Sequence, residues 1–321
     1  MHKRLIGIVF GVFGLFAGDC LAQEPKWTSE QSQQLLADTK RLAADEMQGR
    51  KPGTAGHEKA QEYLIDRFRT LELKTFGSGY RHGFEYNKAL SYGSGVNLIG
   101  WLEGSDIPSS FIVYTAHYDH LGKSGNKIYN GADDNASGVS AMLALAEYFS
   151  KNMPKHSMIF IATDGEEAGL FGAKAFVGKP SVPLDSIKLN INLDMIGQGG
   201  RRNTLFVAGT KRQPMLKEIV KTLSEQTRSR QFRMKPGHDK RTAGFRNRGN
   251  ERFNWHDASD HGPFIKKGIP YLYFGVDAHK HYHEVTDDFE HLDTEFFLQA
   301  VSAIHQTVIA VDNLPLGNLS R

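Results

Sequence analysis

The 321-residue sequence has a single cysteine, Cys20, which lies close to the N-terminus. If Cys20 is removed with a leader, the remaining chain has no thiol. That would exclude disulfides, a cysteine nucleophile and a cysteine-based zinc site. The formal net charge is only +3, so nothing global points to nucleic acid and we expect no nucleic-acid partner. We also find no internal repeat and no low-complexity linker.

The first 22 residues have the pattern of a signal peptide. A basic start is followed by the apolar run of residues 5–17, which is too short for a confident membrane span. Small residues near Ala22 predict cleavage after that residue, and hence an exported protein, periplasmic or secreted, with no stable membrane insertion. Two alternatives remain, an uncleaved anchor and a lipoprotein acylated at Cys20. Asp19 disfavours the lipoprotein because a small residue is wanted before the acylated cysteine.

Residues 23–321 alternate helix-like and strand-like segments, which predicts one α/β domain, a sandwich around a mostly parallel mixed sheet with helices on both faces. Helical periodicity is present at residues 28–39, 56–71, 135–150, 215–227 and 295–311. Strand-like apolar runs are residues 95–102, 110–116, 158–163, 189–193, 205–208 and 270–274. The basic, aperiodic stretch of about residues 228–253 predicts a long surface excursion, either functional or simply solvated.

Acidic residues and histidines follow several predicted strands, at the sheet edge where ligands bind in open α/β folds. His117-Tyr118-Asp119 comes directly after one apolar run. A histidine two residues from a carboxylate can bind a metal through one ring nitrogen, while the carboxylate fixes its tautomer. Taken alone, the pair is more typical of a structural contact.

A second cluster is Gly131-Ala132-Asp133-Asp134-Asn135-Ala136-Ser137-Gly138, just before a predicted helix. We expect Asn135 and Ser137 to cap that helix. We expect Asp133 to do more, because the small residues before it leave room for close approach. A carboxylate there can bridge two metal ions through its two oxygens.

Glu166 and Glu167 follow a third apolar run, where two like charges are costly to bury unless a cation lies beside them. One can coordinate a metal while the other stays free to carry a proton. Asp194 ends a further run, and either His281 or His283 has the spacing of a ligand. Two imidazoles and at least three carboxylates at one edge suit two metal ions about 3.5–4 Å apart.

These motifs resemble, in order, the zinc aminopeptidase family that includes aminopeptidase S, aminopeptidase Y and glutamate carboxypeptidase. The match runs over residues 117–287 through His-x-Asp, Gly-Ala-Asp-Asp-Asn-x-Ser-Gly, Gly-Glu-Glu-x-Gly-Leu-x-Gly, Leu-Asp-Met and Tyr-His-x-x-x-Asp. The Gly49-Arg50 entry and Ser259-Asp260-His261 also look like the family. The resemblance implies the phosphorylase/hydrolase-like zinc exopeptidase fold and two Zn²⁺ per chain.

The resemblance also implies a role for each site residue. It puts His117 and Asp194 on one zinc, Glu167 and His283 on the other, and Asp133 between them as the bridge. It makes Glu166 the general base and places Asp119 behind the zinc site. It favours His283 over His281, places a cis peptide after Asp133, and puts Asp260 and His261 at the pocket. Peptides with a free amino terminus are the implied substrates.

Other functions remain open at this stage. A glutaminyl cyclase resembles the same fold but uses one zinc, and a carboxypeptidase or dipeptidase lies within the same family. From another class, the chain would be a binding protein with purely structural metals. Cobalt or manganese would also suit these ligands, so zinc rests on the resemblance. The preferred first residue of the substrate and the oligomeric state are not indicated by the sequence.

Overall fold

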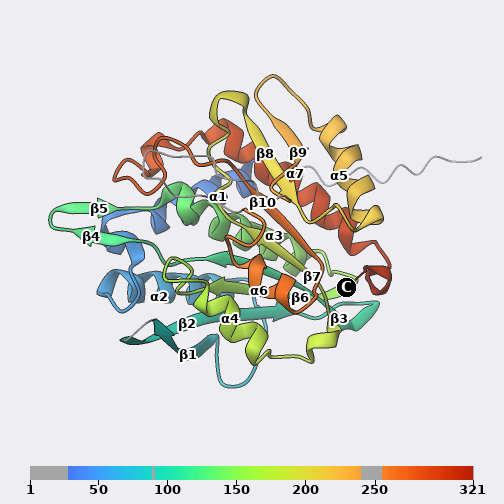
Figure 1. The fold of residues 1–321 in the computed structure, drawn as a ribbon, viewed down its shortest axis with the longest axis horizontal. Coiled ribbons are helices and arrows are strands. Elements are labelled where there is room, and N and C mark those ends of the chain that lie inside the picture. The colour runs from blue at the N-terminus through green and yellow to red at the C-terminus, as the bar shows by residue number, and fades with distance from the viewer. Residues whose placement is uncertain (1–27, 89–90, 240–254, 321) are drawn as a thin grey trace, which may run out of the picture.

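The computed structural model describes residues 28–88, 91–239 and 255–320 (Figure 1). The predicted signal peptide, and much of the predicted excursion, lie outside these residues. Within the described part, eight strands form one sheet in the order β1-β2-β6-β3-β7-β10-β8-β9. Their bounds are β1 Arg81–Lys88, β2 Ser91–Leu102, β3 Ile107–His117, β6 His156–Thr163, β7 Ile187–Leu193, β8 Thr204–Ala208, β9 Arg233–Pro236 and β10 Tyr271–Gly275.

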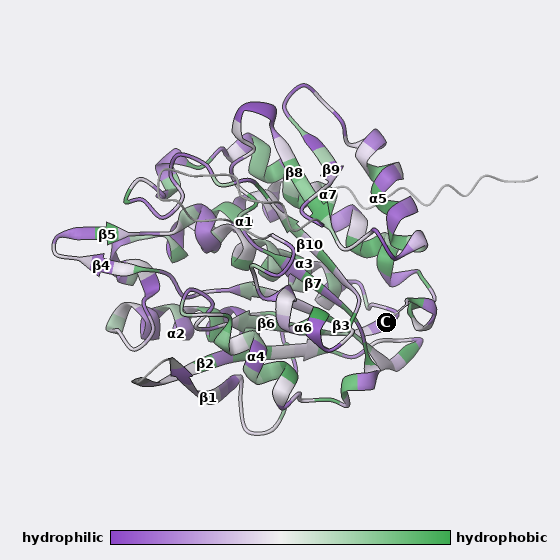
Figure 2. Cartoon of the chain, viewed as in Figure 1, coloured by the Kyte–Doolittle hydropathy of each residue, from purple (hydrophilic) through white to green (hydrophobic). Residues whose placement is uncertain are grey.

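The four central strands, β6, β3, β7 and β10, run parallel to one another. The pairs β1–β2, β2–β6 and β10–β8 are antiparallel, so the sheet is mixed. Every residue of β6 is buried, because helices cover both faces of the sheet. This burial explains why the sequence shows continuous apolar runs rather than the alternation of a half-exposed strand. Figure 2 shows hydrophobic residues along these central strands.

Helices cover the two faces of the sheet unequally (Figure 1). One hydrophobic cluster joins one face to α1 Ser29–Leu42, α2 Ala55–Thr70, α3 Gly138–Lys151, α5 Pro214–Gln226 and α7 Thr294–Asp312. A smaller cluster joins the other face to α4 Phe171–Gly178 and α6 His261–Lys266, through Phe176 and Phe264. The predicted three-layer α/β/α sandwich is confirmed. A short ribbon, β4 Gly122–Ser124 with β5 Lys127–Tyr129, extends from the sandwich.

Several local expectations need correction. The helix expected from residue 135 begins at Gly138, after a turn of π-helix at Ala132–Ser137. Asn135 Oδ1 does accept the Gly138 N–H at 3.0 Å, but Ser137 makes no capping bond and instead donates to the Asp133 carbonyl. The expected excursion contains β9, which pairs with β8 at the sheet edge.

Among the described residues, no helix combines the length and apolar character that spanning a membrane requires.

Candidate metal centre

The carboxyl ends of three parallel strands bring the acidic and imidazole side chains to one edge of the sheet. His117 ends β3, Glu166 and Glu167 follow β6, and Asp194 follows β7. His283 reaches the same place from the loop after β10. Each of these buried strands ends where its apolar run ends. The polar side chains that follow therefore lie at the carboxyl edge of the sheet, where ligands bind in open α/β folds.

The first group of donors consists of His117, Asp134 and Asp194. His117 Nε2 lies 3.3 Å from Asp194 Oδ1 and 3.3 Å from Asp134 Oδ1. One donor atom from each of the three residues lies within 4.8 Å of the other two. His117 Nδ1 lies 3.1 Å from the Asp119 carbonyl oxygen, and donation to that oxygen leaves Nε2 with a lone pair for a cation. The Asp119 carboxylate is farther from Nδ1, at 3.9 Å.

The second group surrounds Glu167. His283 Nε2 lies 3.1 Å from Asp134 Oδ2 and 3.4 Å from Glu167 Oε2. His120 Nδ1 lies 2.8 Å from the other Glu167 oxygen, Oε1, and 3.9 Å from Asp134 Oδ2. His120, Asp134 and Glu167 therefore also form a group with donor atoms within 4.8 Å of one another. Sequence reasoning gave His120 no role, although it stands in the motif next to Asp119.

Asp134, and not Asp133, lies between the two groups. The side chain of Asp133 points elsewhere: its Oδ1 accepts the Gly197 N–H at 2.6 Å, and its Oδ2 lies 2.9 Å from His279 Nε2. The expected cis peptide also occurs one residue later than expected, between Asp134 and Asn135. Two adjacent aspartates in a turn point to different sides, and sequence alone does not show which one faces the cluster.

Two buried residues hold the loops that carry these side chains. Asp287 accepts the N–H groups of Asp133 and Asp134 at 2.9 and 3.0 Å. Arg50, 1% exposed, donates to four backbone carbonyls, those of Leu42, Tyr118, Asn130 and Gly131, at 2.6–2.9 Å. A fixed guanidinium thus joins the loop after β3 to the turn before Asp134. The only sequence signal for Arg50 was the Gly49-Arg50 resemblance.

Glu166 lies beside the first group, and its N–H donates to Asp119 Oδ1 at 3.1 Å. Burial raises the pKa of Glu166 well above its ordinary value, and the nearby Asp194 and Glu167 carboxylates add to this. Burial alone would lower the pKa of His117, but Glu166 and Asp194 raise it well above its ordinary value. The negative charge in the cluster therefore exceeds what the imidazoles neutralise.

The chemistry of the donors fits zinc. All are imidazole nitrogens or carboxylate oxygens, which are the usual zinc ligands where thiols are absent. The excess of carboxylates over imidazoles calls for cations. His281 does not line the cavity that the other donors face, and its Nδ1 lies within hydrogen-bond distance of Thr286 Oγ1, at 2.9 Å.

The donors face a small cavity of about 80 Å³. Its walls include Trp255, Ser259, His261, Tyr273 and Tyr282. Asp260 does not line this cavity; it is buried behind it, accepts a bond from Thr163 Oγ1, and burial raises its pKa to about 6. Burial lowers the pKa of His261 to about 3, so this wall residue is neutral at pH 7.

The fold and the donor set together fit the class of zinc-dependent peptidases. The chain belongs to peptidase family M28, whose sequence pattern matches residues 97–308. The curated relatives include a vacuolar membrane protease from Candida tropicalis, 32% identical over 157 residues. That match covers 46% of this chain and only 16%, about a sixth, of the length of the relative.

Solved structures of similar fold share 17–20% sequence identity with this chain. A Zn-dependent exopeptidase from Parabacteroides distasonis has a TM-score of 0.66 over 90% of this chain and 98% of its own. A zinc aminopeptidase from Bacillus subtilis gives 0.67 over 90% and 98%. A glutaminyl cyclase from Bacteroides thetaiotaomicron gives 0.65 over 89% and 98%. The fold therefore does not separate the peptidase from the cyclase.

The predicted periplasmic or secreted location is contradicted by the curated relatives, which are vacuolar membrane proteases. A basic start followed by a short apolar run does not identify the compartment in which a protein finally resides. The prediction went beyond what that pattern shows.

Proposed function

We propose that this chain is a two-zinc aminopeptidase with Asp134 as the bridging ligand. The observation that carries the proposal is that the two oxygens of Asp134 face two different imidazoles, Oδ1 toward His117 and Oδ2 toward His283. His117 and Asp194 complete one zinc site, and Glu167 and His283 complete the other. A carboxylate that bridges two sites in this way is typical of two-metal hydrolases.

His283 is the better ligand of the two histidines near Glu167. Its Nε2 approaches Glu167 Oε2 and Asp134 Oδ2, so those three atoms can surround one cation. His120 approaches the opposite oxygen of Glu167, where an N–H donor would orient the carboxylate. We therefore assign His120 to positioning Glu167.

Zinc bound here would polarise the scissile carbonyl and lower the pKa of a bound water toward neutrality. Glu166 takes a proton from the attacking water as its oxygen bonds to the carbonyl carbon. Glu166 then delivers that proton to the amine as the carbon–nitrogen bond breaks. Asp119 positions two of these groups: its carboxylate accepts the Glu166 N–H, and its backbone carbonyl lies 3.1 Å from His117 Nδ1.

The substrates we infer are peptides with a free amino terminus. Carboxylates line the small cavity beside Trp255 and Tyr282, and their field attracts an ammonium group. The cavity has room for little more than one end of a chain. A single residue removed from the amino terminus is the product that follows.

An assay with amino-acid anilides tests this function. The zinc-loaded protein should release the amine, lose activity with a chelator, recover it with zinc, and fail on N-acetylated anilides. A glutaminyl cyclase would instead form pyroglutamate from peptides that begin with Gln and would hold one zinc. Cleavage of peptides with a blocked amino terminus but not a blocked carboxyl terminus would indicate a carboxypeptidase and contradict the proposal.

A further inference from the structure

A larger cavity, of about 820 Å³, lies beside the metal centre at the same edge of the sheet. The loops after β7 and β10 line it, together with β8. One lining residue, His279, lies 2.9 Å from Asp133, which directly precedes the bridging Asp134. The cavity is therefore adjacent to the catalytic machinery, yet the reaction proposed above does not use it.

Its lining is strongly cationic. Arg201, Arg202 and Lys280 border the cavity, and none of them has an ion-pair partner among the described residues. Among the described residues of the lining, the only carboxylate is that of Asp277, which lies 3.0 Å from His238 Nε2. Three cations facing one carboxylate give a positive field in a concave space, which is a favourable setting for a ligand carboxylate.

The two arginines stand on a fixed turn, η4 Gly200–Arg202. Gly199 packs so closely against Phe296 that a β-carbon there would lie 2.5 Å from its ring, and the Gly199 carbonyl accepts the Thr204 N–H at 3.0 Å. Gly200 has φ +58°, which favours glycine. These contacts with α7 and β8 fix the position of the turn that carries the two arginines.

Stacked rings separate this cavity from the catalytic one. Phe206 lines the cationic cavity, His238 stacks on Phe206 at 4.4 Å between ring centroids, and Trp255 stacks on His238 at 4.8 Å. Trp255 in turn lines the catalytic cavity. Because a peptide residue spans about 3.5 Å, a few residues suffice to cross from one cavity to the other.

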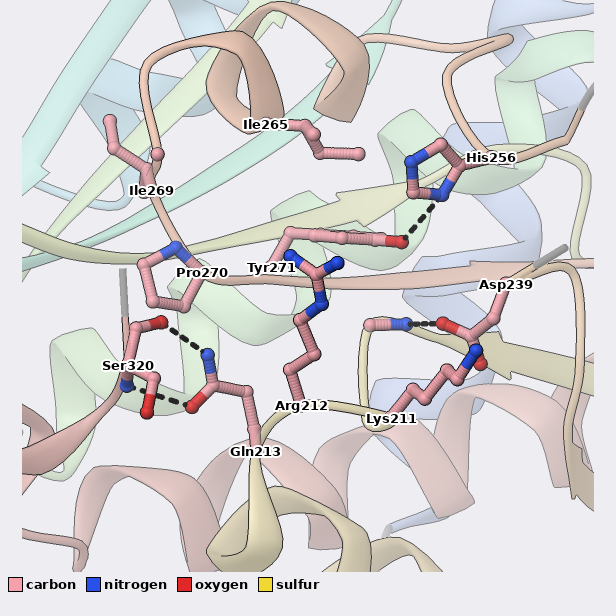
Figure 3. A pocket seen from close by; sticks show the side chains of 12 residues that line it. Lys211, Arg212, Gln213, Asp239, His256, Ile265, Ile269, Pro270, Tyr271 and Ser320 are labelled. Atoms are coloured by element: carbon pink, nitrogen blue, oxygen red, sulfur yellow. Dashed lines mark hydrogen bonds between the residues drawn. The ribbon is translucent and has the colours of Figure 1, made fainter. Parts of the chain in front are cut away.

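A third cavity, at the amino end of β10, is also partly basic but has a different balance of charge (Figure 3). Lys211 and Arg212 line it together with Asp239, and the positive charge of Lys211 attracts the Asp239 carboxylate. His256 and Tyr271 lie on its wall, and His261, stacked on Tyr271 at 5.1 Å between ring centroids, lines the catalytic cavity. Its charge is more nearly balanced, so it gives no comparable preference.

We propose that the cavity lined by Arg201, Arg202 and Lys280 is a subsite for a substrate carboxylate, so that the enzyme prefers acidic peptides. This inference rests on the proposed peptidase function and names its substrate class. The carboxylate belongs either to an Asp or Glu side chain near the scissile bond or to the free carboxyl terminus of a short peptide. Both present the same chemistry to the guanidinium groups.

The test uses zinc-loaded protein and matched tetrapeptides. Each pair differs by Glu or Gln at the first, second or third position, and each peptide is made with a free or an amidated carboxyl terminus. We expect kcat/KM at low salt to be about tenfold higher for at least one acidic member, an effect of about 1.4 kcal/mol. That preference should fall with added salt.

The triple variant Arg201→Gln/Arg202→Gln/Lys280→Gln should lose most of this preference, chiefly through KM, while keeping its zinc content and its rate on a neutral anilide. Lys217→Gln, which removes an exposed cation on α5, is the matched control and should keep the preference. A response to amidation alone identifies the carboxyl terminus as the ligand; a response to Glu against Gln identifies the side chain.

Equal rates on all pairs in the wild-type protein would overturn the subsite, and so would a preference that survives in the triple variant. Hydrolysis of no peptide or anilide by the wild-type protein would instead overturn the peptidase function on which the subsite depends.

Discussion

Asp287 Oδ2 accepts the backbone N–H of Asp134 at 3.0 Å, while its Oδ1 accepts that of Asp133 at 2.9 Å. Asp287 thereby fixes the turn that carries both aspartates. Of the two, only Asp134 has its carboxylate between His117 and His283. This arrangement leads to a direct comparison of the two neighbours.

Asp134→Asn and Asp133→Asn should differ sharply in metal content. An amide at position 134 loses the charge shared by both sites, so we expect metal binding to fail and activity to fall by at least about a thousandfold. Asp133→Asn keeps an oxygen for the Gly197 N–H, so zinc should be retained. Zinc per chain after dialysis measures the difference. The reverse ranking would return the bridge to Asp133.

Glu166→Gln should keep the zinc and the fold but lose hydrolysis, because the variant cannot accept a proton from water. We expect a fall in kcat of about 10²–10⁴-fold. Glu167→Gln is the matched comparison and should lose zinc as well as activity. Zinc content and kcat, measured on the same preparation, separate the two roles. A Glu166→Gln enzyme with normal kcat would remove Glu166 from the mechanism.

His283→Asn should cost one of the two zincs, whereas His120→Asn should weaken zinc binding by about 10–100-fold without abolishing it. The physical reason is that, in the proposed site, His283 supplies a ligand atom and His120 only orients Glu167. Competition with a chromophoric chelator gives both affinities. If His120→Asn alone loses a metal, the two histidines have to be exchanged in the assignment.

Arg50→Met should lower the free energy of unfolding by about 3–5 kcal/mol, because four buried carbonyls lose their donor at once. Arg69→Met is the control, since Arg69 and its partner Asp66 are both mostly exposed, and less than about 1 kcal/mol is expected there. Urea unfolding of the zinc-free proteins measures both. Similar losses in the two variants would show that Arg50 does not hold the loops together.

His305 should make the protein sensitive to acid. Burial lowers its pKa to about 4, below the ordinary value of about 6.5 expected in the unfolded chain. Between these values the unfolded chain binds more protons, so this contribution to stability is complete above about pH 6.5 and is lost as the pH falls toward 4. His305→Leu should therefore lose less stability than wild type between pH 7 and pH 5 in urea titrations. Equal losses would contradict this.

The sequence predicted the central architecture because the buried parallel strands are long apolar runs that each end in a polar cluster. Their order along the chain placed His117, Asp194, a glutamate pair and a histidine pair at one edge. The family resemblance selected Glu167 and His283 from those pairs, and the structure brings the four residues together. Sequence did not resolve which of two adjacent aspartates faces the cluster, because that depends on backbone dihedrals within the π-helical turn and on the distant Asp287.

Short or weakly patterned elements were also missed. Helix α6 has six residues and β9 has four, too few for a periodicity to be seen. His120 contacts Glu167, which is 47 positions away in the sequence, and Arg50 contacts Tyr118, which is 68 positions away. Such tertiary contacts leave no local pattern in the sequence. The cationic cavity likewise forms only when the loops after β7 and β10 come together.

Crystals of the zinc-loaded protein, measured on both sides of the zinc absorption edge, test the central claim most directly. Two anomalous peaks of similar height are predicted, about 3.5 Å apart, with one Asp134 oxygen next to each and His117 and His283 on opposite sides. A single peak, or a pair of peaks bridged by Asp133 or by no aspartate, would contradict the account.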